Sequence, residues 1–230
     1  MLNFVLLAAV ASATARFLPS NRLSVPYYDP NANGGSMLNN ALDGYGEPLN
    51  VIISALSSPE VLQYEGFYNY AQAIGFSEEC FGIHLGDPFS ANLGDGNGWV
   101  NQTVELRQDY DSPDIGTCLE SLIGGNHFRL YVQNGTAADS GALFLAVSKE
   151  EPLSEQHNVV PDGYNIGRDL LSASAIGVTS YNGIIYSTVG VKVTGLLPAG
   201  SVGVNHNIST DGYTTVLTVT IVPTWWFYAQ

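Results

Sequence analysis

The residue types that could do chemistry are concentrated between Gly124 and Asp169, a stretch that holds two of the four histidines. Between Asn126 and Gln133 apolar and polar residues alternate, which is typical of a strand with two different faces. His127 and Arg129 then share one face, about 7 Å apart. Two side chains at that spacing can act on one ligand.

A second group of polar residues follows further along the same stretch. His157 stands alone before a predicted helix start, at which Asp162 or Asn165 caps a helix that continues through Arg168 and Asp169. Imidazoles with a nearby carboxylate can transfer protons near neutral pH, and a guanidinium can bind a phosphate or carboxylate. The candidate site residues are therefore His127, Arg129, His157, Arg168 and Asp169.

Three interpretations of these candidates stay open. They form a buried hydrogen-bonded network in which Arg129 pairs with Asp169 or Glu150, or an enzymatic or small-ligand site, or a metal site made of His127, His157 and a carboxylate. The chain has no H-E-x-x-H, phosphate-loop or G-x-S-x-G motif. No catalytic residue is therefore assigned, and no cofactor is predicted.

Periodicity and turn residues predict an α+β fold. The predicted domain has a mixed or antiparallel sheet, two or three helices and a C-terminal strand meander. Whether the meander joins the first sheet is open. The predicted strands are 49–54, 126–133, 142–148, 186–197 and 213–222, with a possible short strand at 80–86; the predicted helices are 59–74, a short one near 117–122 and the one through Arg168.

The N-terminal segment is typical of an exported protein. Residues 1–15 have a short apolar run followed by Ala13-Thr14-Ala15, the small-x-small pattern of a signal peptide, and the run is too short to span a bilayer. Residues 16–40 are predicted to be an extended lead-in. Residues 41–230 are predicted to form one globular domain, with a core at 41–175 and a strand-rich part at 176–230.

Cysteines and sequons agree with secretion to the extracellular space. Cys80 and Cys118 are the two cysteines, and in an oxidising compartment an even pair predicts one disulfide. Asn101, Asn134 and Asn207 begin N-x-S/T sequons and are predicted glycosylation sites. No transmembrane segment is predicted.

The charge balance restricts the partners. The net charge is −14 and rests on only seven Lys and Arg residues, so the field of the protein repels nucleic acid and anionic membranes. Asp95-Gly96-Asn97-Gly98 begins like a calcium loop, but Trp99 and Leu106 stand where oxygen ligands are needed, which argues against an EF-hand. A looser calcium or turn role remains open.

Several segments resemble known families. Residues 41–175 resemble a group of fungal secreted proteins of unknown function, through LGDGNGWVNQTVELRQDYDSPDIGTCLESL, GGNHFRLY, GALFLAVSKEE and EQHNVVPDGYNIGRDLL. Residues 124–171 are remotely similar to the LssY C-terminal domain family, with His127 and Arg129 on its H-x-R strand, His157 as its isolated histidine, and Arg168 and Asp169 at its helix start. Neither resemblance implies an activity.

The sequence therefore predicts an acidic, secreted glycoprotein that works as an extracellular binding or structural module. Its predicted partner is an extracellular ligand or a cell-wall component. The alternative is a hydrolase or small-ligand-binding protein that uses the His/Arg residues on an anionic or polar substrate.

Overall fold

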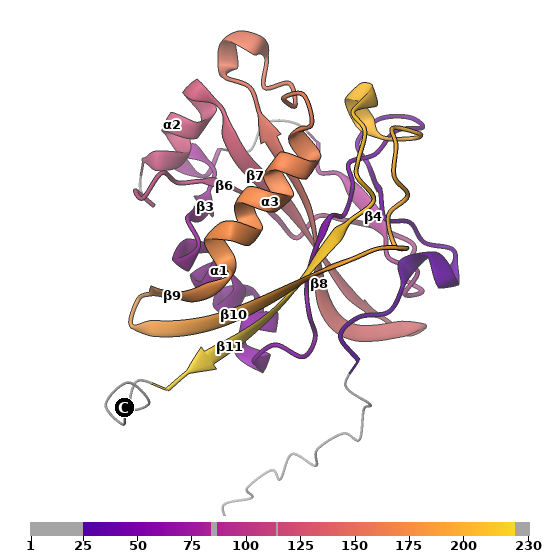
Figure 1. Cartoon of the computed structure of the whole chain (residues 1–230), viewed down its shortest axis with the longest axis horizontal. Coiled ribbons are helices and arrows are strands. Elements are labelled where there is room, and N and C mark those ends of the chain that lie inside the picture. Colours follow the sequence, from indigo (N-terminus) through magenta and orange to yellow (C-terminus); the bar gives the residue numbers. More distant parts are fainter. Residues whose placement is uncertain (1–24, 84–86, 114, 224–230) are drawn as a thin grey trace, which may run out of the picture.

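The computed structural model describes residues 25–83, 87–113 and 115–223. They form an α+β domain, as predicted, in which three α-helices accompany a curled, mostly antiparallel sheet (Figure 1). The sheet has eight strands in the order β3-β6-β7-β8-β2-β11-β10-β9, and a separate sheet has three, in the order β1-β4-β5. The α-helices are α1 (Tyr64–Ala73), α2 (Gly116–Ile123) and α3 (Gly163–Ala175).

The bounds of the other elements are as follows. The strands are β1 (Asn39–Asn40), β2 (Val51–Ile53), β3 (Phe76–Glu78), β4 (Ser90–Asn92), β5 (Trp99–Asn101), β6 (Val104–Gln108), β7 (Gly125–Gly135), β8 (Ala138–Glu150), β9 (Gly177–Tyr181), β10 (Ile184–Val193) and β11 (Thr214–Val222). The 3-10 helices are η1 (Pro30–Asn33), η2 (Pro59–Leu62), η3 (Cys80–Gly82), η4 (Leu153–Glu155) and η5 (Asn205–Asn207).

The C-terminal strand meander is confirmed, and it joins the first sheet. Strand β11 pairs with β2 in parallel, from Thr215 opposite Val51 to Leu217 opposite Ile53. Strands β9 and β10 are joined at Asn182-Gly183, and both of these residues have positive φ, as a two-residue hairpin turn of type I′ requires. One continuous sheet therefore runs through both halves of the chain.

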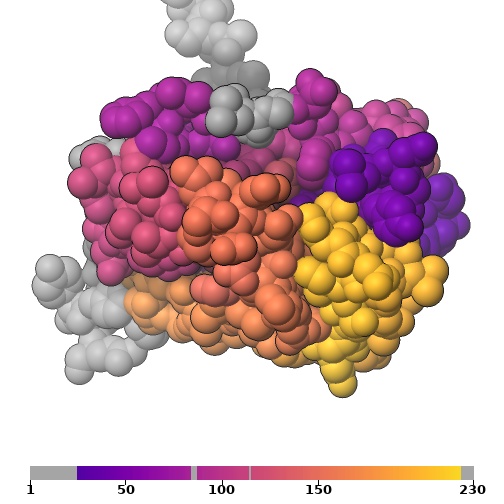
Figure 2. Space-filling model, turned by 90° about the horizontal axis from the view of Figure 1, so that it is seen from above, coloured from indigo at the N-terminus to yellow at the C-terminus, as the bar shows by residue number. Residues whose placement is uncertain are grey.

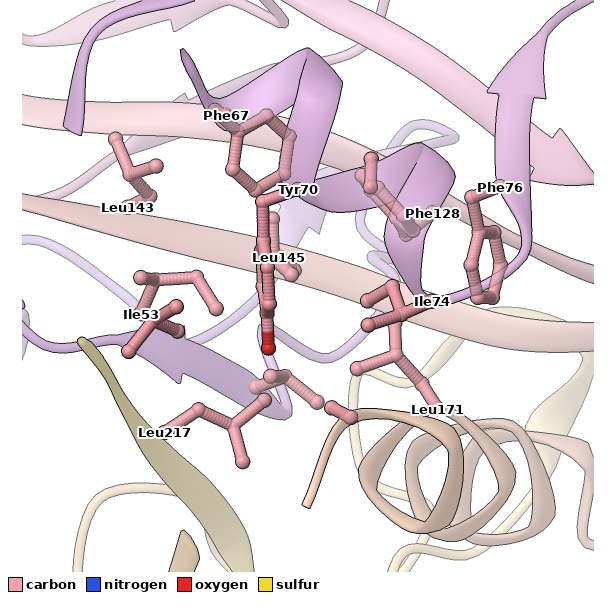
Figure 3. Packing of buried hydrophobic residues seen from close by; sticks show 14 of the residues in the cluster. Ile53, Phe67, Tyr70, Ile74, Phe76, Phe128, Leu143, Leu145, Leu171 and Leu217 are labelled. Carbon is pink, nitrogen blue, oxygen red and sulfur yellow. The ribbon is translucent and has the colours of Figure 1, made fainter. Parts of the chain in front are cut away.

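One face of the sheet is covered by α1 and α3. Phe67 and Tyr70 of α1 and Leu171 of α3 are buried against strand residues that include Phe128 and Leu145 (Figure 3). Helix α3 lies very close to β7 and β8, because a Cβ on Gly167 would come within 2.7 Å of Asn126 Oδ1. A side chain at that position would push the helix away from the sheet.

The opposite face carries a second core, to which the N-terminal segment contributes. Met37 is buried there with Ile52 of β2 and Phe144 of β8, so the packed domain begins before residue 41. Figure 2 shows the N-terminal segment, in indigo, beside the yellow C-terminal part. Hydrogen bonds join the two, from Asn31 Nδ2 to the Leu196 carbonyl and from Gly46 N to the Gly203 carbonyl.

Some predicted elements differ in detail. The helix predicted at 59–74 is divided at Gln63 into η2 and α1, and the hydroxyl of Ser58 accepts a hydrogen bond from Ile221 N instead of capping a helix. Residues 80–82 form η3, so the possible strand there is wrong for the part of 80–86 that is described. Asp162 immediately precedes α3 but its side chain caps no backbone N–H; it accepts a hydrogen bond from Asn165 Nδ2.

The predicted disulfide is confirmed. Cys80 in η3 is bonded to Cys118 in α2, which joins the segment after β3 to the helix beside it. None of the helices in the described residues has the length and apolar character that a bilayer-spanning helix needs. The predicted signal peptide lies outside the described residues.

Candidate functional site

The candidate residues of β7 lie on one face of the sheet, as their alternation predicts. Phe128 and Leu130 are buried in the core beneath α1 and α3, whereas His127 and Arg129 lie on the opposite face. Pairing with the neighbouring strand places Arg107 opposite His127 and Glu105 opposite Arg129. Charged side chains from adjacent strands are thereby brought together.

Arg107 is the centre of this group, although its sequence position did not single it out. Its guanidinium donates from Nη1 to Glu150 Oε2 (2.9 Å) and Glu120 Oε2 (3.1 Å), from Nη2 to Glu105 Oε1 (2.8 Å), and from Nε to Glu79 Oε1 (3.3 Å). Each nitrogen of the guanidinium therefore contacts a carboxylate.

Arg129 is paired in the same way. It donates from Nη1 to Glu47 Oε2 (2.7 Å), and its Nη2 lies 3.1 Å from Glu105 Oε2. Its guanidinium carbon also lies 4.3 Å from the centre of the Phe89 ring, a cation–π contact. The predicted pairing with Asp169 or Glu150 is therefore wrong, because Glu47 and Glu105 lie closer in space.

His127 is completely buried, and its neighbours define its tautomer. Arg129 Nη1 lies 3.0 Å from His127 Nε2, and because a guanidinium only donates, Nε2 is the acceptor and Nδ1 carries the proton. Burial lowers the pKa of His127 well below its usual value, and the positive charges of Arg129 and Arg107 lower it further. The imidazole is therefore neutral.

Glu150 links the two predicted histidines. Its Oε1 lies 3.4 Å from His127 Nδ1 and its Oε2 lies 3.6 Å from His157 Nδ1, but neither contact has hydrogen-bonding geometry. Burial raises the pKa of Glu150 to about 7, Arg107 opposes the shift, and Glu120 adds to it. Four carboxylates contact Arg107 and only one of them, Glu105, also contacts Arg129, so the excess negative charge favours a proton on Glu150.

We call these residues the β6–β8 network: Glu47, Glu79, Glu105, Arg107, Glu120, His127, Arg129, Glu150 and His157. Three of the five predicted site residues belong to it. Of its five carboxylates only Glu150 was considered, as a partner of Arg129, and the other four were missed because the five are spread from residue 47 to residue 150. The alternation of Glu105, Leu106 and Arg107 was the one local signal that could have indicated part of it.

Arg168 and Asp169 belong elsewhere. Arg168 is buried and donates to Asp211 Oδ2 (2.8 Å), Asp169 Oδ1 (2.8 Å) and the Tyr213 carbonyl (2.9 Å), so it ties α3 to the start of β11. Lys192 Nζ also lies 2.8 Å from Asp169 Oδ1. Among the described contacts of Arg168, none is with a member of the β6–β8 network.

The metal interpretation finds no support in the described residues, where no group of three or more His, Cys, Asp and Glu side chains has an arrangement that could hold a metal ion. Asp95, in the calcium-like loop, accepts hydrogen bonds from the backbone N–H groups of Asn97, Asn134 and Gly135. That carboxylate therefore stabilises its own turn and joins it to the end of β7.

The three sequon asparagines are all on the surface. Asn101 lies in β5, Asn134 near the end of β7 and Asn207 in η5, and each is exposed. An attached glycan would find no steric obstacle from the core at these positions.

Comparison of the chain with family models, curated proteins and solved structures gives no match. The resemblance to fungal secreted proteins and to the LssY C-terminal domain family therefore stays a prediction.

Proposed function

We propose that this protein is a secreted glycoprotein that works as an extracellular binding or structural module. The observation that carries the proposal is that both arginines of the β6–β8 network are already paired with carboxylates of the protein. Arg107 and Arg129 are surrounded by carboxylates, and the imidazole of His127 is fully buried. A substrate anion would have to displace carboxylates from both guanidinium groups, which is unfavourable in so acidic a protein.

The disulfide supports secretion, since such bonds persist in oxidising compartments. Expression of the full chain in a secreting eukaryotic host tests this part. We expect protein in the medium that begins after Ala15 and loses mass when N-linked glycans are removed. Retention in the cell, or a secreted chain without glycans, would contradict it.

The module function is tested by measuring whether ligand binding persists when residues of the β6–β8 network are substituted. Glu150→Gln and His157→Ala change polar groups of the network while preserving its apolar surroundings. We expect both variants to co-sediment with insoluble extracellular polysaccharides as the unchanged protein does. Loss of co-sedimentation in both, with folding intact by circular dichroism, would contradict the proposal.

A hydrolase is the second candidate, and one observation favours it. Within the part of the chain that the structure describes, Nδ1 of His127 and of His157 have no hydrogen-bond partner, and both lie near Glu150, whose pKa of about 7 suits a general acid or base. Hydrolysis of chromogenic ester or phosphate substrates that is lost in Glu150→Gln would favour this candidate over the module. We expect no such activity.

A further inference from the structure

A hollow of about 600 Å³ lies on the face of the sheet that carries α1 and α3. Its lining residues come from the end of α1, the start of β3, the turn after β6, the start of β7, α3 and the end of β9. Figure 1 shows the ribbons of these elements. The volume is within the range of ligand pockets, roughly 300–1,000 Å³. It is separate from the β6–β8 network, because Asn126 lines it whereas the next residue, His127, faces the other side of the sheet.

A second hollow of about 590 Å³ continues along α1. Gln72 and Tyr181 line both hollows, so the two meet at these side chains. Tyr68 lines the far part and stacks on Tyr64, with ring centroids 6.4 Å apart and planes 4° from parallel. We call the two hollows together the α1 groove. It has the extended form that a chain-like ligand needs.

The lining of the α1 groove is polar but not cationic. None of the described residues that line it is Lys, Arg or His. Its partly exposed amides are those of Gln72 and Gln108, whereas the Asn126 amide is buried, donates from Nδ2 to the Gly167 carbonyl and has its Oδ1 beside Gly167 of α3. Amides both donate and accept, so they recognise hydroxyl groups, and tyrosine rings add flat apolar faces beside them. Anionic ligands find no countercharge.

The carboxylates in the lining do not turn the α1 groove into a cation site. Asp109 is buried, and its oxygens accept hydrogen bonds from Ser77 Oγ (3.0 Å) and Asp111 N (3.1 Å). Burial also raises the pKa of Asp109, which is the opposite of the effect of a site built to hold a positive charge. Two further carboxylates in the lining, Glu65 and Asp111, are exposed. The groups available to a ligand are therefore amides, aromatic rings and these two carboxylates, which accept hydrogen bonds from hydroxyl groups.

We propose that the α1 groove binds a neutral saccharide chain, with Gln72 and Tyr181 at its middle. Hydroxyl groups would hydrogen-bond to the amides, and the apolar face of a sugar ring would stack on Tyr181. This inference rests on the proposed module function and names its ligand class. Gln72 and Tyr181 are both partly exposed, so they are accessible to such a chain.

The test measures binding of four neutral hexasaccharides, cellohexaose, laminarihexaose, mannohexaose and chitohexaose, to the full secreted protein by isothermal titration calorimetry. We expect at least one to bind, and Tyr181→Ala and Gln72→Ala each to weaken it about tenfold or more. Loss of one good aromatic or polar contact of about 1.4 kcal/mol corresponds to that factor. Thermal unfolding of each variant shows that the fold is intact.

Tyr45→Ala and Trp99→Ala are the matched controls. Both side chains are aromatic, about half exposed and outside the α1 groove. Binding that is lost in Trp99→Ala but kept in Tyr181→Ala would overturn the inference and leave the module function standing. Binding of a lysine-rich peptide, with no binding of any hexasaccharide, would do the same. Substrate turnover that depends on Glu150 would instead overturn the module function itself.

Discussion

The two faces of strand β7 differ in how far their polar groups are already satisfied. On one face, His127 and Arg129 belong to the β6–β8 network, in which each arginine contacts two or more carboxylates. On the other face, the α1 groove lies beside Asn126, and its side chains Gln72 and Tyr181 are partly exposed. The two faces of one strand therefore have opposite roles.

The comparison shows that residue type alone is a poor guide to a site. Histidine and arginine are the residues a search for chemistry selects first, yet here Arg107 and Arg129 pair with carboxylates inside the protein and His127 is buried and neutral. Gln72 and Tyr181 of the α1 groove attract no attention in the sequence, but they are partly exposed and can meet a ligand. A charged side chain is buried at low cost only where neighbouring groups pair with it, and a paired charge is not available to a substrate.

Among the substitutions that test this contrast, Arg107→Met is expected to lower the free energy of unfolding the most. It removes the only positive charge that contacts Glu120 and Glu150 among the described residues and leaves buried carboxylates without compensation. Breaking a buried ion pair on one side costs about 3–5 kcal/mol of unfolding free energy. Urea denaturation measures this loss of unfolding free energy.

Lys192→Met is the matched control, because the Lys192–Asp169 pair is about half exposed. An exposed ion pair contributes about 0–1 kcal/mol. If Arg107→Met costs no more than Lys192→Met, the β6–β8 network is not a structural centre and the contrast between the two faces fails.

Removal of the disulfide is expected to have the next largest effect on stability. Helix α2 carries Glu120 to Arg107, and Cys118 in the same helix is bonded to Cys80, 38 residues earlier. In the chain-entropy model, closing a loop of that length stabilises the domain by about 4 kcal/mol, and measured values are often lower. We expect the double variant Cys80→Ser/Cys118→Ser to unfold at lower urea concentration. An unchanged midpoint would show that α2 is held by packing alone.

Glu150 is expected to make stability depend on pH. Burial raises its pKa from 4.5 to about 7 in the folded protein, so between these values the folded state holds a proton that the unfolded state has lost. This contribution is fully present below pH 4.5 and is lost as the pH rises to about 7. Glu150→Gln should remove this part of the slope in denaturation measured from pH 4.5 to 7.5. A slope unchanged by the substitution would contradict the assignment.

Gln72→Ala is expected to have the smallest effect on stability. Gln72 is partly exposed on α1, and alanine is a better helix former, so the unfolding free energy should change by no more than about 0.5 kcal/mol. Together with the weaker saccharide binding expected above, this would show that the α1 groove is dispensable for folding. A loss of several kcal/mol would make Gln72 a structural residue like Arg107.

Local patterns predicted much of the fold. The alternation from Asn126 to Gln133 placed His127 and Arg129 on one face, as observed, since side chains on a strand alternate whatever the partner strands are. The presence of two cysteines predicted one disulfide between them, and the structure confirms it. The tight turn of the meander is at Asn182-Gly183, between β9 and β10, whereas a long connection over residues 194–213 joins the paired strands β10 and β11.

By itself, the sequence determined the α+β class, the faces of β7 and the disulfide, because each depends on periodicity or on residue count. The tertiary structure alone decided that β11 pairs with β2, that Arg129 meets Glu47 across 82 residues, and that the α1 groove exists. These features depend on which distant segments lie side by side. Local periodicity says which way a side chain points but not what it meets there.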